Sequence, residues 1–352
     1  MIEQLLRDRN LPPLLPTGME ASAWPGRRRE LLDALAKGQY GVSPPAPPSV
    51  KAETLLEMET LGGKALHRRV RLSFPTPAGE FSFPVDLVLP SGGAMPVVLH
   101  ISFLPFPGGL LTPVEEIVDN GYAVALFCCN DVTEDGDDGF TSGVAGHYPR
   151  TGPDAWGKLA MWAWGASRVM DHLATLPEVD QKRVAVAGMS RLGKAALWCA
   201  AQDERFAAAL INESGSSGAA LARGKTGETV ASITKAFPYW FCENFAQYGG
   251  REAEMPFDQH WLLAAVAPRP LCVGSAAGDL WSDPQNEFLG CAAASGAWEL
   301  LGLKGLLHQD NLPQPGDALL EGRLGYHLRK GSHFFTRQDW QRFLAFLDRH
   351  MA

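Results

Sequence analysis

The hydrophobic pattern of the chain changes its period at two places. Between residues 65 and 89, apolar and polar positions alternate and are interrupted once, by the turn Pro77-Ala78-Gly79. Such alternation predicts two antiparallel strands with one buried face. Further along, short and almost continuously apolar runs, typical of strands covered on both faces, alternate with segments of helical period. The pattern therefore predicts an α/β fold: a mostly parallel central sheet with an N-terminal antiparallel hairpin and helices on both faces.

The predicted elements follow one another in a regular order. We expect further strands at about 96–103, 123–127, 183–189, 207–212, 269–275 and 324–328. Helices are expected at about 25–36, 114–119, 153–176, directly after Ser190, at 284–301 and at 337–350, the last one starting from a capping box of Thr336 and Asp339. Residues 1–50, with the proline-rich stretch 43–48, are expected to wrap around a single domain formed by residues 51–352.

Composition and charge narrow the class of protein. The 352 residues are 46% hydrophobic and 20% charged, with a formal net charge of -8 and no long basic tract, so we expect no nucleic-acid partner. No apolar run approaches the ~20 residues of a membrane span, and the first residues lack the apolar segment of a signal peptide. The six cysteines form no C-x-x-C pair and are expected as buried thiols in a reducing compartment. We therefore predict a cytoplasmic protein with no membrane partner; its oligomeric state is left open.

Five acidic residues gather in the segment that follows the strand at 123–127. They are Asp131, Glu134, Asp135, Asp137 and Asp138. Their spacing misses the ligand pattern of a calcium loop, so a solvated loop and no metal site are predicted.

One stretch, Gly188-Met189-Ser190-Arg191-Leu192-Gly193, has the form of a reactive turn. An apolar run precedes Ser190 and a helical segment follows it, so the serine stands at the tip of a strand-to-helix turn. Such a turn exposes the hydroxyl and aims helix N–H groups at whatever it attacks. The pattern departs from G-x-S-x-G because the second glycine comes one residue late. On this motif alone, a nucleophile and an ordinary serine helix cap remain equal alternatives.

Four chemically useful side chains follow directly from predicted strands: Ser190, Glu213, Asp279 and His333. Sites in parallel sheets form at the carboxyl ends of strands, and a serine nucleophile needs a base and a group that orients that base. The order serine, acid, histidine is that of the α/β-hydrolase fold, with His333 as the candidate base. The acid stays open between Asp279 and Glu213. The structural alternatives are a pairing of Glu213 with Arg191 or Arg223, and a turn cap at Asp279.

The motif Gly188-x-Ser190-Arg191-x-Gly193-Lys194 resembles the G-C-S-R-x-G-K signature of the glucuronoyl esterases, carbohydrate esterases that cleave esters of 4-O-methyl-glucuronic acid. The resemblance covers most of the chain. Its other segments are Trp24–Pro44, Trp162–Gly165, Glu213–Gly215, Arg223, Thr226–Glu228, Phe237–Phe241, Pro256–His260, Ala267–Leu271, Asp279–Trp281 and Gly331–His333.

The resemblance implies a role for each matching residue. Ser190 would be the nucleophile and His333 the general base. Glu213 matches the usual acid of the family, and Asp279 the alternative acid of bacterial members. Arg191 would stabilise the oxyanion through its backbone N–H and its guanidinium. The substrate-binding candidates are Lys194, Glu228 and Trp281, with Arg223 as a weaker one. No metal or organic cofactor is implied.

Two departures bear on the substrate. Met189 and Phe334 stand where fungal members of the family have cysteines, so the disulfide of those members is absent. The lack of an export signal favours oligosaccharide or small uronate esters over an intact cell-wall polymer. The sequence thus predicts a serine ester hydrolase similar to glucuronoyl esterases. The alternatives are an acetyl-xylan or other small-ester esterase on the same fold, and an inactive sugar-binding protein.

Overall fold

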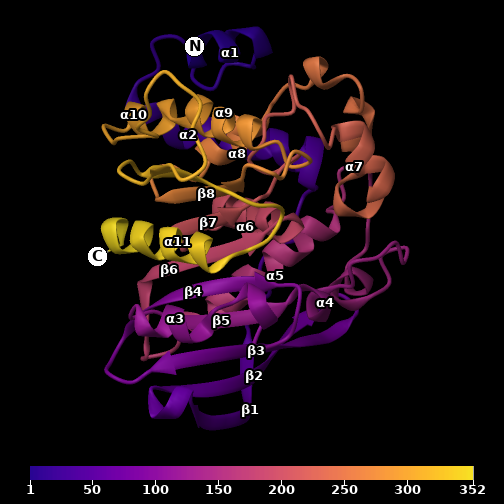
Figure 1. The fold of residues 1–352 in the computed structure, drawn as a ribbon. Helices are drawn as coiled ribbons and strands as arrows, with labels where there is room; N and C mark the ends of the chain where they lie inside the picture. The colour runs from indigo at the N-terminus through magenta and orange to yellow at the C-terminus, as the bar shows by residue number, and fades with distance from the viewer. Residues whose placement is uncertain (352) are drawn as a thin grey trace.

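A mixed sheet of ten strands organises the computed structural model, which describes residues 1–351 (Figure 1). Its strand order is β1-β2-β3-β5-β4-β6-β7-β8-β10-β9. The strands are β1 (Lys51–Thr60), β2 (Ala65–Thr76), β3 (Gly79–Pro90), β4 (Met95–Ser102), β5 (Ala123–Cys128), β6 (Val179–Met189), β7 (Ala208–Asn212), β8 (Leu271–Ala276), β9 (Ala318–Leu319) and β10 (Leu324–Arg329).

The antiparallel end of the sheet confirms the predicted hairpin. Strands β2 and β3 pair without a break from Ala65 opposite Pro90 to Thr76 opposite Gly79. The edge strand β1 was not predicted. Almost all of its residues are exposed, so it has no buried face and no apolar alternation. Cross-strand ion pairs hold it instead, such as Arg68 Nε to Glu57 at 2.6 Å and Arg71 to Glu53 at 2.9 Å.

The parallel strands from β5 to β10 are covered on both faces, which explains their continuous apolar runs. Val98 and Ala185 pack with helices α3 and α11, whereas Val97 and Val186 pack on the opposite face with helices such as α5 and α6. The helices are α1 (Ile2–Arg9), α2 (Trp24–Leu35), α3 (Val114–Asp119), α4 (Cys129–Val132), α5 (Lys158–Leu173), α6 (Arg191–Gln202), α7 (Val230–Ala236), α8 (Gln259–Ala264), α9 (Pro284–Ala294), α10 (Gly296–Leu300) and α11 (Arg337–His350).

The helices confirm the predicted elements with two differences. The segment predicted as one helix from 284 to 301 is divided at Ser295, whose hydroxyl accepts the backbone N–H of Leu306 at 2.6 Å. The helix predicted from residue 153 begins only at Lys158, because the N–H of Gly157 is bound to the carbonyl of Tyr40 at 2.9 Å. The predicted capping box of Thr336 and Asp339 is present at the start of α11.

The N-terminal segment packs on the helices of one face. Trp24, Leu31 and Leu35 of α2 are buried, and the ring of Tyr40 stacks on Trp198 of α6 at 4.6 Å. Helix α1 contacts α9, beside which it lies in Figure 1. The division into a wrapping segment, residues 1–50, and a single domain, residues 51–352, stays a prediction. Within residues 1–351, none of the helices combines the length and apolarity that a bilayer span requires.

Candidate active site

Ser190 occupies a strained turn between β6 and α6. Its backbone has φ 57° and ψ -127°, a conformation that costs a non-glycine residue about 1–3 kcal/mol. The turn is held because the Ser190 N–H donates to Asn212 O at 2.9 Å and Ser190 O accepts from Lys194 N at 3.0 Å. Only glycine fits at position 188, because a Cβ there would lie 2.2 Å from the carbonyl oxygen of Leu192. The structure thus contains the strand–serine–helix turn that the sequence predicts.

The sheet order brings the four strand-end residues to one edge. Ser190 follows β6, Glu213 follows β7, Asp279 follows β8 and His333 follows β10, and these strands are neighbours in that order. Ligand atoms of Glu213, Asp279 and His333 all lie within 4.8 Å of one another. Three side chains that are far apart in the sequence therefore form one cluster beside the serine turn.

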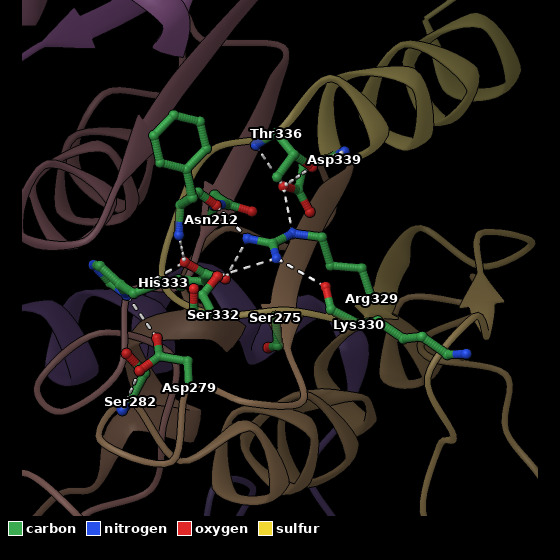
Figure 2. Close-up of polar contacts among 12 residues, drawn as sticks. Asn212, Ser275, Asp279, Ser282, Arg329, Lys330, Ser332, His333, Thr336 and Asp339 are labelled. Atoms are coloured by element: carbon green, nitrogen blue, oxygen red, sulfur yellow. Dashed lines mark hydrogen bonds and ion pairs between the residues drawn. The ribbon is translucent and has the colours of Figure 1, made fainter.

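His333 faces both candidate acids with the same ring nitrogen. Its Nδ1 lies 2.6 Å from Asp279 Oδ2 and 3.3 Å from Glu213 Oε2 (Figure 2). Burial raises the pKa of Asp279, but the hydrogen bonds from His333 and Ser282 outweigh it and leave that pKa below its usual value. An Nδ1–H bound to Asp279 leaves Nε2, on the other side of the ring, free to accept a proton. The shorter contact favours Asp279 as the main partner of the imidazole.

Glu213 is held differently, by donors that the sequence analysis missed. Its Oε1 accepts from Arg329 at 2.7 Å and its Oε2 accepts the Phe334 N–H at 2.7 Å. Burial raises the pKa of Glu213, while Arg329 and the Phe334 N–H counteract part of the rise. The pairing of Glu213 with Arg191 or Arg223 is therefore wrong, since the partner is Arg329. The rule of strand ends could have found this residue, because Arg329 is the last residue of β10.

The guanidinium of Arg191 is held above the serine helix by the acidic loop. It forms an ion pair with Asp135 and lies 4.9 Å from the ring centre of Trp240. Asp135 also accepts Trp240 Nε1 at 2.8 Å and Tyr239 Oη at 3.3 Å. Within residues 1–351, Arg191 Nε is buried and has no hydrogen-bond partner, so one donor of this cation stays available.

The acidic loop is only in part the solvated loop that its composition suggests. The ammonium of Lys158, which is completely buried, donates to Glu134 O at 2.7 Å, Gly136 O at 2.7 Å and Asp138 Oδ1 at 2.8 Å. The prediction of a solvated loop agrees with the exposed Glu134 and Asp137. It is wrong for Asp135 and Asp138, whose side chains pair with Arg191 and Lys158 on helices outside the loop.

Three of the predicted substrate-binding residues lie next to one another. Lys194 is one turn along α6 from Ser190, and its Nζ lies 4.0 Å from Glu228 Oε2. Burial lowers the pKa of Lys194 to about 8. The backbone N–H of Glu228 donates to Trp281 O at 3.0 Å, and the Trp281 side chain is 59% exposed. Trp281 thus adjoins Glu228 through the backbone, and its exposed indole offers an apolar face.

Arg223 is engaged elsewhere. Its guanidinium donates to Asp258 at 3.1 Å and to the carbonyls of Phe257 at 3.0 Å and Met255 at 2.6 Å. These contacts fix residues 255–258 and use both terminal nitrogens. We therefore correct the expectation for Arg223 and leave it out of the substrate contacts.

The fold and this site together define a class. A serine on a strained turn after a parallel strand, with a histidine–carboxylate pair at the neighbouring strand ends, is the arrangement of serine hydrolases of the α/β-hydrolase fold. A family model for glucuronyl esterases of fungi matches residues 74–302. The chain belongs to the glucuronoyl esterase family, which confirms the resemblance and the predicted fold.

Individual relatives agree with this placement. Carbohydrate esterase MZ0003, from an unidentified prokaryote, is 43% identical over 245 residues, which are 68% of this chain but only 56% of the relative. The 4-O-methyl-glucuronoyl methylesterase 1 of Wolfiporia cocos is 31% identical over 302 residues, 82% of this chain and 70% of that protein. The solved glucuronoyl esterase from Solibacter usitatus superposes with a TM-score of 0.90 at 36% identity, covering 97% of this chain and 98% of that one.

Proposed function

We propose that this protein is a serine esterase that hydrolyses esters of glucuronic or 4-O-methyl-glucuronic acid. The observation that carries the proposal is the strained Ser190 turn, bonded to the end of β7, together with the His333–Asp279 pair at the neighbouring strand ends, where Nδ1 contacts Asp279 at 2.6 Å. The substrate class rests on the relatives, since the 31% identical protein of Wolfiporia cocos is named a 4-O-methyl-glucuronoyl methylesterase.

In this proposal each residue takes one step. Ser190 Oγ attacks the ester carbonyl while His333 Nε2 takes the hydroxyl proton. His333 then gives that proton to the leaving alcohol oxygen as its bond to the acyl carbon breaks. In the second half, His333 takes a proton from water as the hydroxide attacks the acyl carbon. The bond from that carbon to Ser190 Oγ then breaks, His333 returns the proton to Oγ, and the uronic acid leaves. The carboxylates at Nδ1 hold the ring tautomer and stabilise the imidazolium in both halves.

Arg191 supplies the oxyanion donors in this proposal. Its backbone N–H is at the first position of α6, where no carbonyl of the preceding turn can accept it. Its Nε is buried and lacks an acceptor within the described part of the chain, and a buried N–H of this kind gains from a substrate oxygen. One such donor typically lowers the barrier by about 3 kcal/mol.

Lys194, Glu228 and Trp281 make the difference between a uronate and an acetate ester. A glucuronoyl group carries hydroxyls on the acyl side of the scissile bond, whereas an acetyl group carries none. Lys194 and Glu228 are both buried, with 4.0 Å between Nζ and Oε2, so they offer a hydrogen-bond donor and acceptor that an acetyl group cannot use. The indole face of Trp281 suits the apolar face of a sugar ring.

The test compares turnover of benzyl glucuronate with turnover of p-nitrophenyl acetate, with Ser190→Ala as the inactive control. We expect kcat/KM for the glucuronate to exceed that for the acetate, and both to vanish in the control. Activity on the acetate alone would instead identify a small-ester esterase. Sugar binding without turnover of either ester would identify a sugar-binding protein.

The cysteines support a proposal on location. All six are buried and unpaired, which suits a reducing compartment. We propose a cytoplasmic enzyme that acts on oligosaccharide or small uronate esters. Cell fractionation with an antibody against the protein tests this, and recovery outside the cytoplasm contradicts it.

A further inference from the structure

The loop that carries His333 is wrapped around one buried guanidinium. Arg329 ends β10, is 3% exposed, and donates from one terminal nitrogen to the carbonyls of Lys330 at 3.0 Å and Ser332 at 3.1 Å. The other terminal nitrogen donates to the carbonyl of Phe334. The backbone on both sides of His333 is thus fixed to a single side chain (Figure 2).

The same guanidinium joins two carboxylates. Its second terminal nitrogen donates to Glu213 Oε1 at 2.7 Å, and its Nε donates to Asp339 Oδ2 at 2.8 Å. Asp339 Oδ2 also accepts the N–H of Thr336 at 2.8 Å and thereby caps α11. Arg329 therefore connects the start of α11, the His333 loop and the residue that follows β7, with every nitrogen of its planar fork in use.

Both carboxylate oxygens of Glu213 accept hydrogen bonds, which is the pattern of an ionised carboxylate. Arg329 donates to one of its oxygens and the Phe334 N–H to the other, each at 2.7 Å, and neither donor can accept a carboxyl proton. The other charged groups that face it are the carboxylates Asp279, after β8, and Glu287, on α9, together with the ring of His333. Burial and those two carboxylates favour the protonated acid, so the anion depends on the Arg329 cation.

We propose that Arg329 is a positioning residue of this esterase site, which fixes the loop that aims His333 and favours the anionic form of Glu213 beside the imidazole. The proposal deepens the proposed function and rests on it for the catalytic meaning of His333. A substitution at Arg329 can separate the fixing of the His333 loop from the charge next to Glu213. A lysine keeps a cation near Glu213, but it is a point charge without the planar fork that binds the loop carbonyls.

The first experiment titrates His333 by NMR in the folded protein and needs no turnover. We compare the wild type with Arg329→Met, Glu213→Gln, and the double variant, after assigning the resonance with His333→Gln. Loss of an anion next to the ring destabilises the imidazolium, so the pKa of His333 should fall by about 1 unit in each single variant. The double variant should show the same shift as Arg329→Met, because Glu213 carries no charge in either protein.

The second experiment measures kcat and the pH profile of Arg329→Lys on benzyl glucuronate. Because the cation remains, the acid limb of kcat/KM should stay within about 0.3 unit of the wild type. Because a lysine cannot make the several hydrogen bonds that the guanidinium makes to the loop carbonyls, kcat should fall by about 10–100-fold. Arg329→Met should lower kcat and also move the acid limb to lower pH.

Arg28→Met is the matched control. Arg28 is also buried and donates from Nε to the carbonyl of Ala265 at 2.7 Å, and from a terminal nitrogen to Ala201 O. Arg28 belongs to α2, and its side chain contacts the C-terminal end of α6. Ser190 precedes the N-terminal end of α6. Replacement of Arg28 should lower the Tm but leave the His333 titration and kcat unchanged.

Three results would overturn the proposal. They are an unchanged His333 pKa in Arg329→Met while Glu213→Gln lowers it, additive shifts in the double variant, and wild-type kcat in Arg329→Lys. If Arg329→Met does not fold, Arg329→Lys together with Glu213→Gln decides between charge and geometry. Failure of the wild type to hydrolyse a glucuronate ester overturns the proposed function alone, because the titration of His333 still tests the link between Arg329 and Glu213.

Discussion

The two carboxylates at His333 invite a direct comparison of Asp279→Asn with Glu213→Gln. Both contact Nδ1, Asp279 at 2.6 Å and Glu213 at 3.3 Å. The oxygens of Glu213 are already occupied by Arg329 and the Phe334 N–H, whereas the other donor to the Asp279 carboxylate within residues 1–351 is the Ser282 N–H, at 3.2 Å. We therefore expect both variants to lose rate and Asp279→Asn to lose more.

The expected size follows from the hydrogen bond that is removed. A hydrogen bond to a charged group contributes about 1.5–3 kcal/mol, which corresponds to about 10–100-fold in rate. An asparagine can also present its amide N–H to Nδ1 and favour the wrong tautomer, a change that costs about 10⁴-fold in proteases with a single acid. Because Glu213 stays in place, we expect about 10²–10³-fold for Asp279→Asn in kcat, and about threefold to tenfold for Glu213→Gln.

The assay is steady-state hydrolysis of benzyl glucuronate at a pH on the plateau of the rate profile. Asp86→Asn is the control, because it breaks a second buried carboxylate–histidine pair, with 2.8 Å between Asp86 and His67, on strands β2 and β3. It should lower the Tm and leave kcat within about twofold. A larger loss in Glu213→Gln than in Asp279→Asn, or no loss in Asp279→Asn, refutes the assignment of the main acid.

Three further outcomes are expected. Lys194→Met should raise KM for benzyl glucuronate by about tenfold and leave p-nitrophenyl acetate turnover unchanged, because Lys194 is proposed to touch the sugar only; equal losses on both esters would contradict this. Asp135→Asn should lower kcat on both esters by about tenfold, since it releases the guanidinium of Arg191 that it pairs with, and a change confined to KM would show that Arg191 binds the ground state. Burial raises the pKa of Glu287 to about 6, so its contribution to stability is complete below the pKa of the unfolded chain and is lost as the pH rises through 6. Urea unfolding at pH 5 and pH 8 should therefore show a loss of about 1 kcal/mol that Glu287→Gln reduces, and identical pH dependence in both proteins would disprove it.

Elements with one buried face were predictable from the sequence, and elements without one were not. The hairpin β2–β3 and the final helix α11 have clear apolar faces, and their observed bounds lie within one or two residues of the prediction. The edge strand β1 has two exposed faces, so its stability comes from pairing with β2 and leaves no periodic signal. The break at Ser295 depends on a bond to Leu306 in a loop that returns from elsewhere, which no local pattern encodes.

The same distinction applies to the site. Ser190, Glu213, Asp279 and His333 were found because each follows a strand, and the order of parallel strands brings such residues together. Arg329 and Asp135 were missed because their meaning lies in pairs between distant segments. The sequence shows only that a cation ends one strand and that a carboxylate lies in a loop. The structure adds that Arg329 holds Glu213 and that Asp135 holds the guanidinium of Arg191.

The neighbouring strand β7 explains why the second glycine of the serine turn is Gly193, one residue later than in the general pattern. A Cβ on Gly193 would lie 3.1 Å from Asn212 O, 3.2 Å from Gly188 O and 3.3 Å from the Cβ of Ser214. Glycine at this position lets the first turn of α6 pack directly on the end of β7, the strand that delivers Glu213. The acid side of the site thus depends on the same close approach as the nucleophile. A glycine at position 192, as in the general G-x-S-x-G pattern, would not relieve the contact at position 193. The packing of α6 on β7 therefore requires the departure from that pattern.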